Sequence, residues 1–297
     1  MSAARRLELP TWLVAAAIYG GWVALTWHAA RLPWWVVVPL GAYLVAWHSS
    51  LQHECIHMHP TRIRWVNTLV ASPPLGVYLP FLLYREGHLQ HHRTGILTDP
   101  IDDPESYYVT PETWDELGGL SRARWWIERT LLGRLVLGPI TMVVRYLASE
   151  LVRMLRGDFA HARAWAGHVV LVAALAAYLE WVGFGFLRYL LWIVWPGTGL
   201  MMMRSFAEHR PASTNEQRTA IVEAWPPLGL LYLYNNLHVI HHEEAARPWY
   251  ELPRRWREDR EMFSTLNGGY VVRGGYVEIA WRWLVRPKDS PRHPGHT

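Results

Sequence analysis

The sequence predicts an all-α integral membrane protein with four transmembrane helices and a cytoplasmic helical cap. Apolar residues make up 51% of the 297 residues and charged residues only 18%, which is outside the usage of soluble proteins. The 19 Trp and 14 Tyr far outnumber the 6 Phe, and Trp and Tyr are the rings that favour the membrane–water interface. Four mostly apolar windows are also long enough to cross the hydrocarbon core of a bilayer.

The four predicted spans form two pairs along the chain. The first pair is 10–30 and 33–52, and the second pair is 165–182 and 187–203. A secretory signal peptide is the alternative for 10–30, because two arginines precede it. Its apolar stretch is too long for a signal peptide and a second span follows at once, so we expect a retained anchor.

The distribution of basic residues predicts the orientation of these spans. The two short links, 31–32 and 183–187, are nearly free of basic residues, whereas the N-terminus and the segments 53–164 and 204–297 hold almost all of them. The positive-inside tendency therefore places those segments and both termini in the cytoplasm, with the spans in the cell (inner) membrane. We expect one domain over 1–297.

Three further apolar stretches contain too many prolines or charges to count as spans. They are 65–84, 131–156 and 219–237. In the second stretch Arg134, Arg145 and Arg156 recur every 11 residues, which predicts a cationic stripe on one helix face. Such a helix is expected to lie in the headgroup plane, with a solvated helix face as the alternative.

Charge and cysteine content exclude several classes of function. The net charge is +4 and the pI is near 9.3, and apart from Lys288 every basic residue is arginine. This balance suits an anionic membrane surface, and no basic run interleaved with aromatics indicates nucleic-acid binding. The single cysteine, Cys55, excludes an intramolecular disulfide framework and a thiolate cluster. Metal chemistry must therefore come from the 16 histidines.

Eight histidines form three clusters with helical spacing. The clusters are His53 and His57, then His88, His91 and His92, and finally His238, His241 and His242. Spacings of three and four residues put side chains on one helix face, so each cluster is a set of two or three imidazoles that can bind a metal ion together. In the four-span arrangement every cluster lies on the cytoplasmic side, where His209, just past the fourth span, is a ninth candidate. The remaining histidines are expected to be structural.

Nine imidazoles exceed the needs of a single metal ion. A catalytic zinc uses about three protein ligands and a water, whereas two ions of higher coordination number would use the whole set. Imidazole suits Fe, Zn, Cu and Ni, so the ligand type alone does not choose the metal. Glu54 and Glu208 adjoin candidate ligands and are placed to accept the second ring N–H. Asp99, Asp102, Asp103 and Glu243 also lie near the clusters and could accept a ring N–H in the same way. For these four residues, a role as an ordinary solvated surface carboxylate is an equal alternative.

The three histidine clusters, in this order and at the ends of paired spans, resemble the membrane-bound fatty acid desaturase superfamily, which also includes hydroxylases and carotenoid ketolases. The resemblance covers about residues 30 to 255. It implies a non-haem di-iron centre that activates O₂, with the eight clustered histidines as metal ligands and His209 matching an extra histidine after the last span. It also implies desaturation of an acyl chain that enters from the membrane.

Two local features depart from the acyl-CoA desaturases within this resemblance. Those enzymes have an asparagine four residues before the extra histidine, where this chain has Ser205, and Asn235 or Asn236 could substitute for it. The short sequence segments that follow His92 and His242 are similar to the corresponding segments of bacterial members, including carotenoid ketolases. A hydroxylase or ketolase that acts on a carotenoid or another lipid is therefore the alternative within the same class.

A membrane metal transporter is the alternative from another class. Transport requires ionisable residues near the middle of the bilayer, but those of 10–30 and 165–182 lie towards the ends. No haem, flavin or iron–sulfur module is visible, so electrons must come from a separate ferredoxin- or rubredoxin-type donor and its reductase. We expect this donor to dock on Arg254, Arg255, Arg257 and Arg260, with anionic lipid as the alternative ligand.

Overall fold

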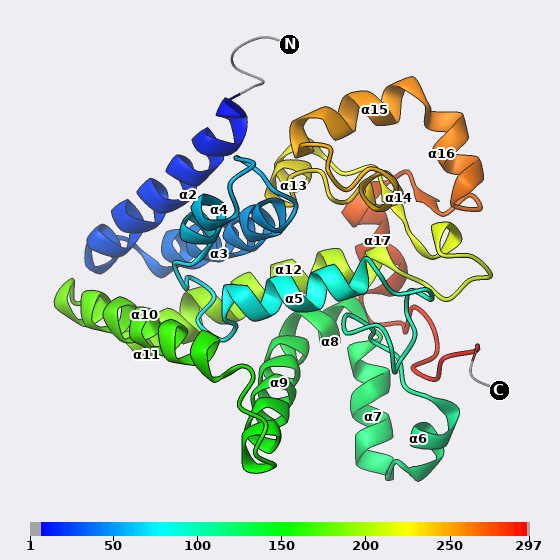
Figure 1. Ribbon diagram of the computed structural model, residues 1–297, viewed down its shortest axis with the longest axis horizontal. Helices are drawn as coiled ribbons and strands as arrows, with labels where there is room; N and C mark the ends of the chain where they lie inside the picture. Colours follow the sequence, from blue (N-terminus) through cyan, green and yellow to red (C-terminus); the bar gives the residue numbers. More distant parts are fainter. Residues whose placement is uncertain (1–6, 296–297) are drawn as a thin grey trace. The chain divides into compact units, whose positions relative to one another are not determined.

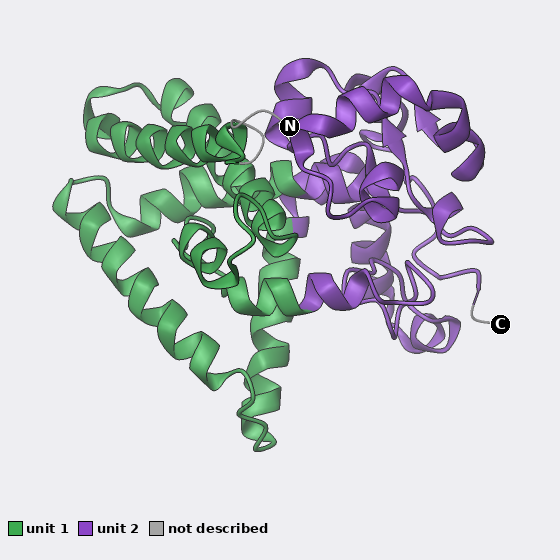
Figure 2. Ribbon diagram, turned by 45° about the horizontal axis from the view of Figure 1, so that its top comes forward, with its two compact units in different colours: residues 1–86, 139–201 green, residues 87–138, 202–297 purple. Residues whose placement is uncertain are grey.

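The computed structural model describes residues 7–295 and is mostly helical (Figure 1). The chain divides into two compact units, drawn in different colours in Figure 2. Unit 1 consists of Met1–Glu86 and Pro139–Met201, and unit 2 consists of Gly87–Gly138 and Met202–Thr297. The prediction of an all-α fold omits one short pair of parallel strands in unit 2, in which β1 (Ile221–Val222) pairs with β2 (Val271–Val272).

Unit 1 is built on the long helices at the N-terminus. Helix α2 (Leu9–His28) is followed by the 3₁₀ turn η1 (Ala29–Arg31) and by α3 (Trp34–Ile56). Proline fits in the first turn of α2, where its missing N–H has no intrahelical partner. A buried relay ties α2 to distant parts of unit 1, because Trp22 Nε1 donates to Tyr189 Oη at 3.0 Å and Tyr189 Oη donates to Leu75 O at 2.7 Å.

Unit 1 also contains α10 (Ala162–Trp181), nearly all of α9 (Gly138–Leu155) and the part of a composite helix that ends at Met201. The composite helix comprises α11 (Phe186–Tyr189), the π-helical segment η2 (Leu190–Val194) and α12 (Trp195–Glu208). The π segment precedes Pro196, whose ring removes an N–H donor from the helix ladder. A Cβ added to Gly197 would lie 3.0 Å from Ala42 O, so α3 packs closely against this helix.

Three described helices are long and apolar enough to cross a membrane. They are Leu9–Arg31, Ala162–Trp181 and Phe186–Glu208, and they contain the predicted spans 10–30, 165–182 and 187–203 except for Val182. The fourth predicted span, 33–52, lies within α3 except for Pro33, but it is not among them. Polar residues such as His48, Ser49 and Gln52 fill the last turns of α3. A fourth span and a cytoplasmic cap therefore remain predictions.

None of the three apolar stretches with many prolines or charges, 65–84, 131–156 and 219–237, forms a candidate span within the described residues. The first contains most of α4 (Arg64–Ala71) and the start of α5 (Phe81–His91), and 219–237 contains β1 and α13 (Pro226–Leu231). The third divides at Leu137 into α8 (Leu131–Val136) and α9.

The predicted cationic stripe along 131–156 is wrong. The helix break at Leu137 separates Arg134 from the other two arginines. Arg134 is only 2% exposed and its guanidinium lies 3.9 Å from the centroid of the Tyr107 ring, whereas Arg145 and Arg156 are exposed. The three arginines therefore do not form one face of one helix.

Unit 2 packs short helices around a small apolar core. These elements are α6 (Pro111–Glu116), α7 (Gly119–Glu128), α8, η3 (Glu216–Arg218), α13, α14 (His238–Glu243), η4 (Trp249–Glu251), α15 (Leu252–Glu258), α16 (Arg260–Leu266) and α17 (Gly275–Trp283). Ile221 of β1, Leu252, Trp256 and Phe263 form a buried cluster with Val239 and Ile240 of α14. Helix α14 is thus anchored through its two central apolar residues, which fixes the histidines on either side of them.

Candidate metal centre

The second histidine cluster is positioned by the end of α5. His88 and His91 lie in the last turn of this helix, and His92 N continues the helical pattern by donating to His88 O at 3.1 Å. The rings of His88 and His91 are only 2% and 1% exposed. The spacing of three and four residues therefore brings the three imidazoles together, as the sequence predicts.

The third cluster is positioned by a strained turn and by β1. Leu233 and Tyr234 both have positive φ values, of 46° and 55°, an arrangement that non-glycine residues adopt only where their surroundings enforce it. The turn leads to Asn235, whose Oδ1 accepts a hydrogen bond from His238 Nδ1 at 3.1 Å. Asn236 instead ties the turn to β1, because its Nδ2 donates to Val222 O at 2.7 Å. Of the two asparagines, Asn235 is thus the one that contacts a candidate ligand.

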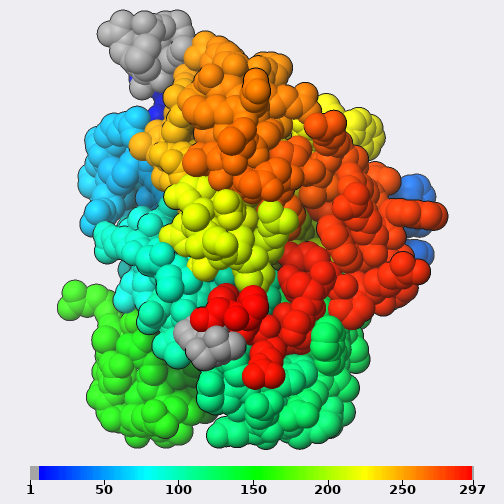
Figure 3. All heavy atoms as spheres, turned by 90° about the vertical axis from the view of Figure 1, so that its right-hand side faces the viewer, coloured from blue at the N-terminus to red at the C-terminus, as the bar shows by residue number. Residues whose placement is uncertain are grey.

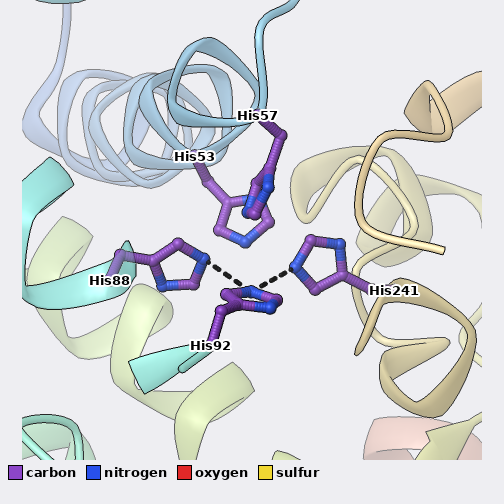
Figure 4. A group of neighbouring side chains, drawn as sticks. All are labelled: His53, His57, His88, His92 and His241. Carbon is purple, nitrogen blue, oxygen red and sulfur yellow. Dashed lines mark hydrogen bonds between the residues drawn. The ribbon is translucent and has the colours of Figure 1, made fainter. Parts of the chain in front are cut away.

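Seven of the nine candidate ligands lie in unit 2, where they form two groups. In the first group His92 Nε2 lies 3.1 Å from both His88 Nε2 and His241 Nε2, as Figure 4 shows. The second group consists of His91, His209, His238 and His242, whose ligand atoms all lie within 4.8 Å of one another. His209 therefore joins the clustered histidines of unit 2.

The other two candidate ligands lie together in unit 1. His53 is in the last turn of α3 and His57 is its C-cap, and their ring centroids are 4.9 Å apart (Figure 4). Glu54 is buried beside them, with Oε1 3.7 Å from His53 Nδ1. The first cluster is thus a pair of adjacent imidazoles with a neighbouring carboxylate.

Carboxylates orient two rings of the second cluster. His88 Nδ1 lies 2.7 Å from Glu105 Oε1, and His91 Nδ1 lies 2.8 Å from Asp103 Oδ1. A carboxylate on Nδ1 holds the ring proton there and leaves Nε2 as the metal-binding atom. Glu105 was not predicted from the sequence, because it lies 13 residues after His92. The signal that could have revealed it is the acidic run that begins at Asp99 and continues through Asp102 and Asp103 to Glu105.

Two of the acidic residues expected to orient ligands have other principal contacts. Asp99 Oδ1 accepts from the backbone N–H groups of Ile101 at 2.8 Å and Asp102 at 2.9 Å, so it caps a turn. Glu208 Oε1 forms an ion pair with Arg204 at 2.8 Å and lies farther, 3.5 Å, from His238 Nδ1. The carboxylates in closest contact with imidazoles in unit 2 are those of Asp103 and Glu105.

The donor pattern of the second group fits a cation. His238 Nδ1 is engaged by Asn235, and His209 Nδ1 lies 3.3 Å from Arg218 O, so both protons belong on Nδ1. The Nε2 atoms of these two rings are nevertheless 3.0 Å apart. Each of them then carries a lone pair and no proton, so the contact is repulsive unless a cation lies between the two atoms. His91 Nε2 is buried and lacks a hydrogen-bond partner. Two cis ligands each about 2.1 Å from one metal would be about 3.0 Å apart, so a metal ion fits this arrangement.

Electrostatics favour the neutral, metal-binding form of most rings. Burial lowers the pKa of both His92 and His209 to about 3 and that of His242 well below its ordinary value. Burial also works to lower the pKa of His91, but the charge of Glu105 and the hydrogen bond to Asp103 raise it to about 8. His92, His209 and His242 therefore offer lone pairs at neutral pH, whereas a metal ion must displace a proton at His91.

The family comparison follows the same residues. The family model described as fatty acid desaturase matches residues 29–274, which include all nine candidate ligands. The chain belongs to the fatty acid desaturase family. A comparison with curated proteins finds no match. The family and the three apolar helices indicate a membrane protein, and the family indicates an oxidoreductase. Its clustered histidines are compatible with a non-haem di-iron site.

Proposed function

We propose that the protein is a membrane-bound, O₂-dependent di-iron desaturase that introduces a double bond into an acyl chain. One observation carries the proposal: a member of the fatty acid desaturase family presents two groups of imidazoles with facing Nε2 atoms. Nitrogen ligands without thiolates suit iron among other metals, and the family selects iron. The acyl chain of a membrane lipid is the substrate in this proposal.

His53 and His57 complete the ligand set in this proposal. The group of His88, His92 and His241 supplies three nitrogens, and the pair from unit 1 would raise the number to five. The second group has four nitrogens of its own. Nine nitrogen ligands suffice for two ions of higher coordination number, as expected from the sequence. In this proposal all nine lie on the cytoplasmic side of the cell membrane.

The residues around the centre would prepare the ligands and exclude water. When bound, the two iron ions with O₂ supply the oxidant that removal of hydrogen from an unactivated C–H bond requires. Asp103 and Glu105 hold the protons of His91 and His88 on Nδ1 and so aim each Nε2 inward. The ligand rings of His238 and His241 are only 2% and 3% exposed, so the surrounding fold keeps solvent away from them.

A separate electron donor is part of the proposal, but the expected docking site is less basic than its sequence indicates. Arg254 forms an ion pair with Glu258, Arg255 with Glu244 and Asp259, and Arg260 with Glu223. Of the four arginines Arg257 is exposed and forms none of the described ion pairs. Because the pairs balance most of the charge, we expect salt to weaken docking of a ferredoxin- or rubredoxin-type donor only modestly.

Lipid mass spectrometry of a host with and without the expressed chain tests the proposal. We expect an acyl chain that has lost two hydrogens, only when O₂ and a reductase–donor pair are present. His92→Ala and His242→Ala should abolish this product, whereas His28→Ala, a change at an exposed histidine outside both groups, should leave it unchanged.

Expression in a carotenoid-producing host distinguishes the two reactions that the same oxidant could carry out, desaturation of an acyl chain and insertion of oxygen into a carotenoid. The sequence segments after His92 and His242 are similar to those of carotenoid ketolases. This similarity favours oxygen insertion as the second candidate function. Oxygenated carotenoid with unchanged fatty acids would replace the desaturase by a ketolase or hydroxylase. Metal uptake into vesicles without any lipid product would instead favour a transporter.

A further inference from the structure

The C-terminal segment 288–293, here called the strap, pairs with a loop that orients two ligands. This loop, Thr98–Val109, contains Asp103 and Glu105 and is called the carboxylate loop. Val109 N donates to Pro291 O at 3.0 Å, and His293 N donates to Val109 O at 2.9 Å, so strap and loop form a parallel bridge. Figure 3 shows the C-terminal segment, in red, at the surface of the molecule.

One end of the strap reaches His91 through three hydrogen bonds. His293 Nδ1 accepts from Gly295 N at 3.1 Å, so the neutral ring carries its proton on Nε2, which donates to Thr98 Oγ1 at 3.0 Å. Thr98 N in turn donates to Asp103 Oδ2 at 2.8 Å, and Asp103 Oδ1 accepts from His91 Nδ1. Thr98 has a φ of 71°, which a threonine keeps only where neighbours hold it. The chain of contacts therefore runs from a buried strap residue to a ligand.

The other end of the strap reaches His209. Lys288 Nζ donates to Phe206 O, in the last turn of α12, at 2.6 Å and to His209 O, just after this helix, at 2.8 Å. Free carbonyls at a helix C-terminus favour a cation. Lys288 also donates its backbone N–H to Arg129 O at 2.8 Å, which fixes the start of the strap.

We propose that the strap positions His91 and His209, and that it thereby controls metal occupancy of the second group rather than the first. The inference rests on the proposed di-metal centre. Both ends of the strap lead to ligands of the same group, which also contains His238 and His242. Lys288 and His293 are positioning residues, since neither belongs to a ligand group.

The strap offers its own control. Pro291 and His293 are buried, whereas Arg292 between them is exposed, and its side chain takes part in neither of the two connections described above. Arg292→Ala therefore changes the strap without removing either connection. Lys288→Arg and His293→Gln are the conservative variants, because each retains an N–H donor at the position that matters.

The experiment counts metal in the purified full-length chain after loading with iron(II). Wild type and Arg292→Ala should hold about two ions per chain, and Lys288→Met and His293→Ala about one. Lys288→Arg and His293→Gln should recover most of the second ion. Release of iron to a chelator should be severalfold faster from the two disruptive variants.

A second change identifies which ion is lost. Added to Lys288→Met, the substitution His241→Ala should remove the remaining ion, whereas His242→Ala should remove nothing more. Two ions retained by Lys288→Met and His293→Ala, or loss of the ion from the first group, would overturn the role of the strap. A wild-type chain with fewer than two ions would instead contradict the di-metal centre itself.

Thr98→Val keeps the test decisive if Lys288→Met does not fold. This substitution preserves side-chain shape and removes only the hydroxyl that His293 contacts. We expect it to speed iron release from the second group. Unchanged release from folded Thr98→Val, together with unchanged release from His293→Ala, would contradict the inference.

Discussion

Glu105 Oε1 lies 2.7 Å from His88 Nδ1, although 17 residues separate the two in the chain. The carboxylate comes from a loop and the imidazole from the last turn of α5, so folding rather than sequence spacing brings them together. Asp103 has the same relationship to His91 at 2.8 Å. The two acids are the most direct means by which the loop controls the candidate metal ligands.

Glu105→Gln and Asp103→Asn should weaken metal binding without unfolding the chain. A neutral amide holds a ring proton on Nδ1 less strongly than a carboxylate does, and loss of such a partner typically costs about 10–100-fold in metal affinity. Competition with a chelator measures this change. Asp102→Asn, on the same loop but exposed, is the matched control and should behave as wild type.

Metal analysis of wild-type protein should give close to two equivalents per chain. His241→Ala and His242→Ala should each lower the count by about one, because they remove ligands from different groups. Zinc could replace iron on overexpression, since imidazole accepts both, so the total is the quantity to measure. A constant count of one that His241→Ala leaves unchanged would rule out two sites.

Gly133→Ala should destabilise unit 2. A Cβ at this position would lie 2.0 Å from Ile127 O, and a backbone atom cannot move aside cheaply. We expect a loss of about 1–3 kcal/mol, seen as a lower Tm in detergent. Gly119→Ala is the control, because nothing lies within 4 Å of its added Cβ. Equal Tm values for the two variants would contradict the close packing of α8 against α7.

Reporter fusions test whether α3 crosses the membrane. Fusions after residues 60, 160, 215 and 290 should report cytoplasm, and a fusion at 184 the opposite side. Fusions after residues 32 and 60 differ only by α3, so opposite reports show that it crosses. Identical reports from these two would leave three spans and would put the first histidine cluster on the side opposite to the N-terminus.

The sequence predicted the apolar helices and the clustering of histidines because both depend on local periodicity. The predicted spans 10–30, 165–182 and 187–203 coincide with candidate spanning helices except at Val182, and the spacing of His88, His91 and His92 sufficed to bring their rings together. Apolar length and helical pitch are properties of a short window, so no knowledge of tertiary contacts was needed.

Features that depend on distant contacts were not predictable in this way. Glu105 and Lys288 approach the candidate ligands from segments with no pattern of their own. Arg134 matched a regular 11-residue repeat, yet the break at Leu137 and stacking on Tyr107 buried it. Periodicity assumes an unbroken helix, and the interruption between α8 and α9 removes its meaning.

The position of Lys288 also allows local opening of the C-terminal segment to be followed by proteolysis. It is the single lysine of the sequence, so a protease specific for lysine can cut the chain at one peptide bond only. With its side chain 8% exposed and bound to two carbonyls, that bond should be cleaved only when the surrounding segment opens. The rate of this single cut, visible as loss of the peptide that follows Lys288, therefore measures how often the segment around Lys288 opens.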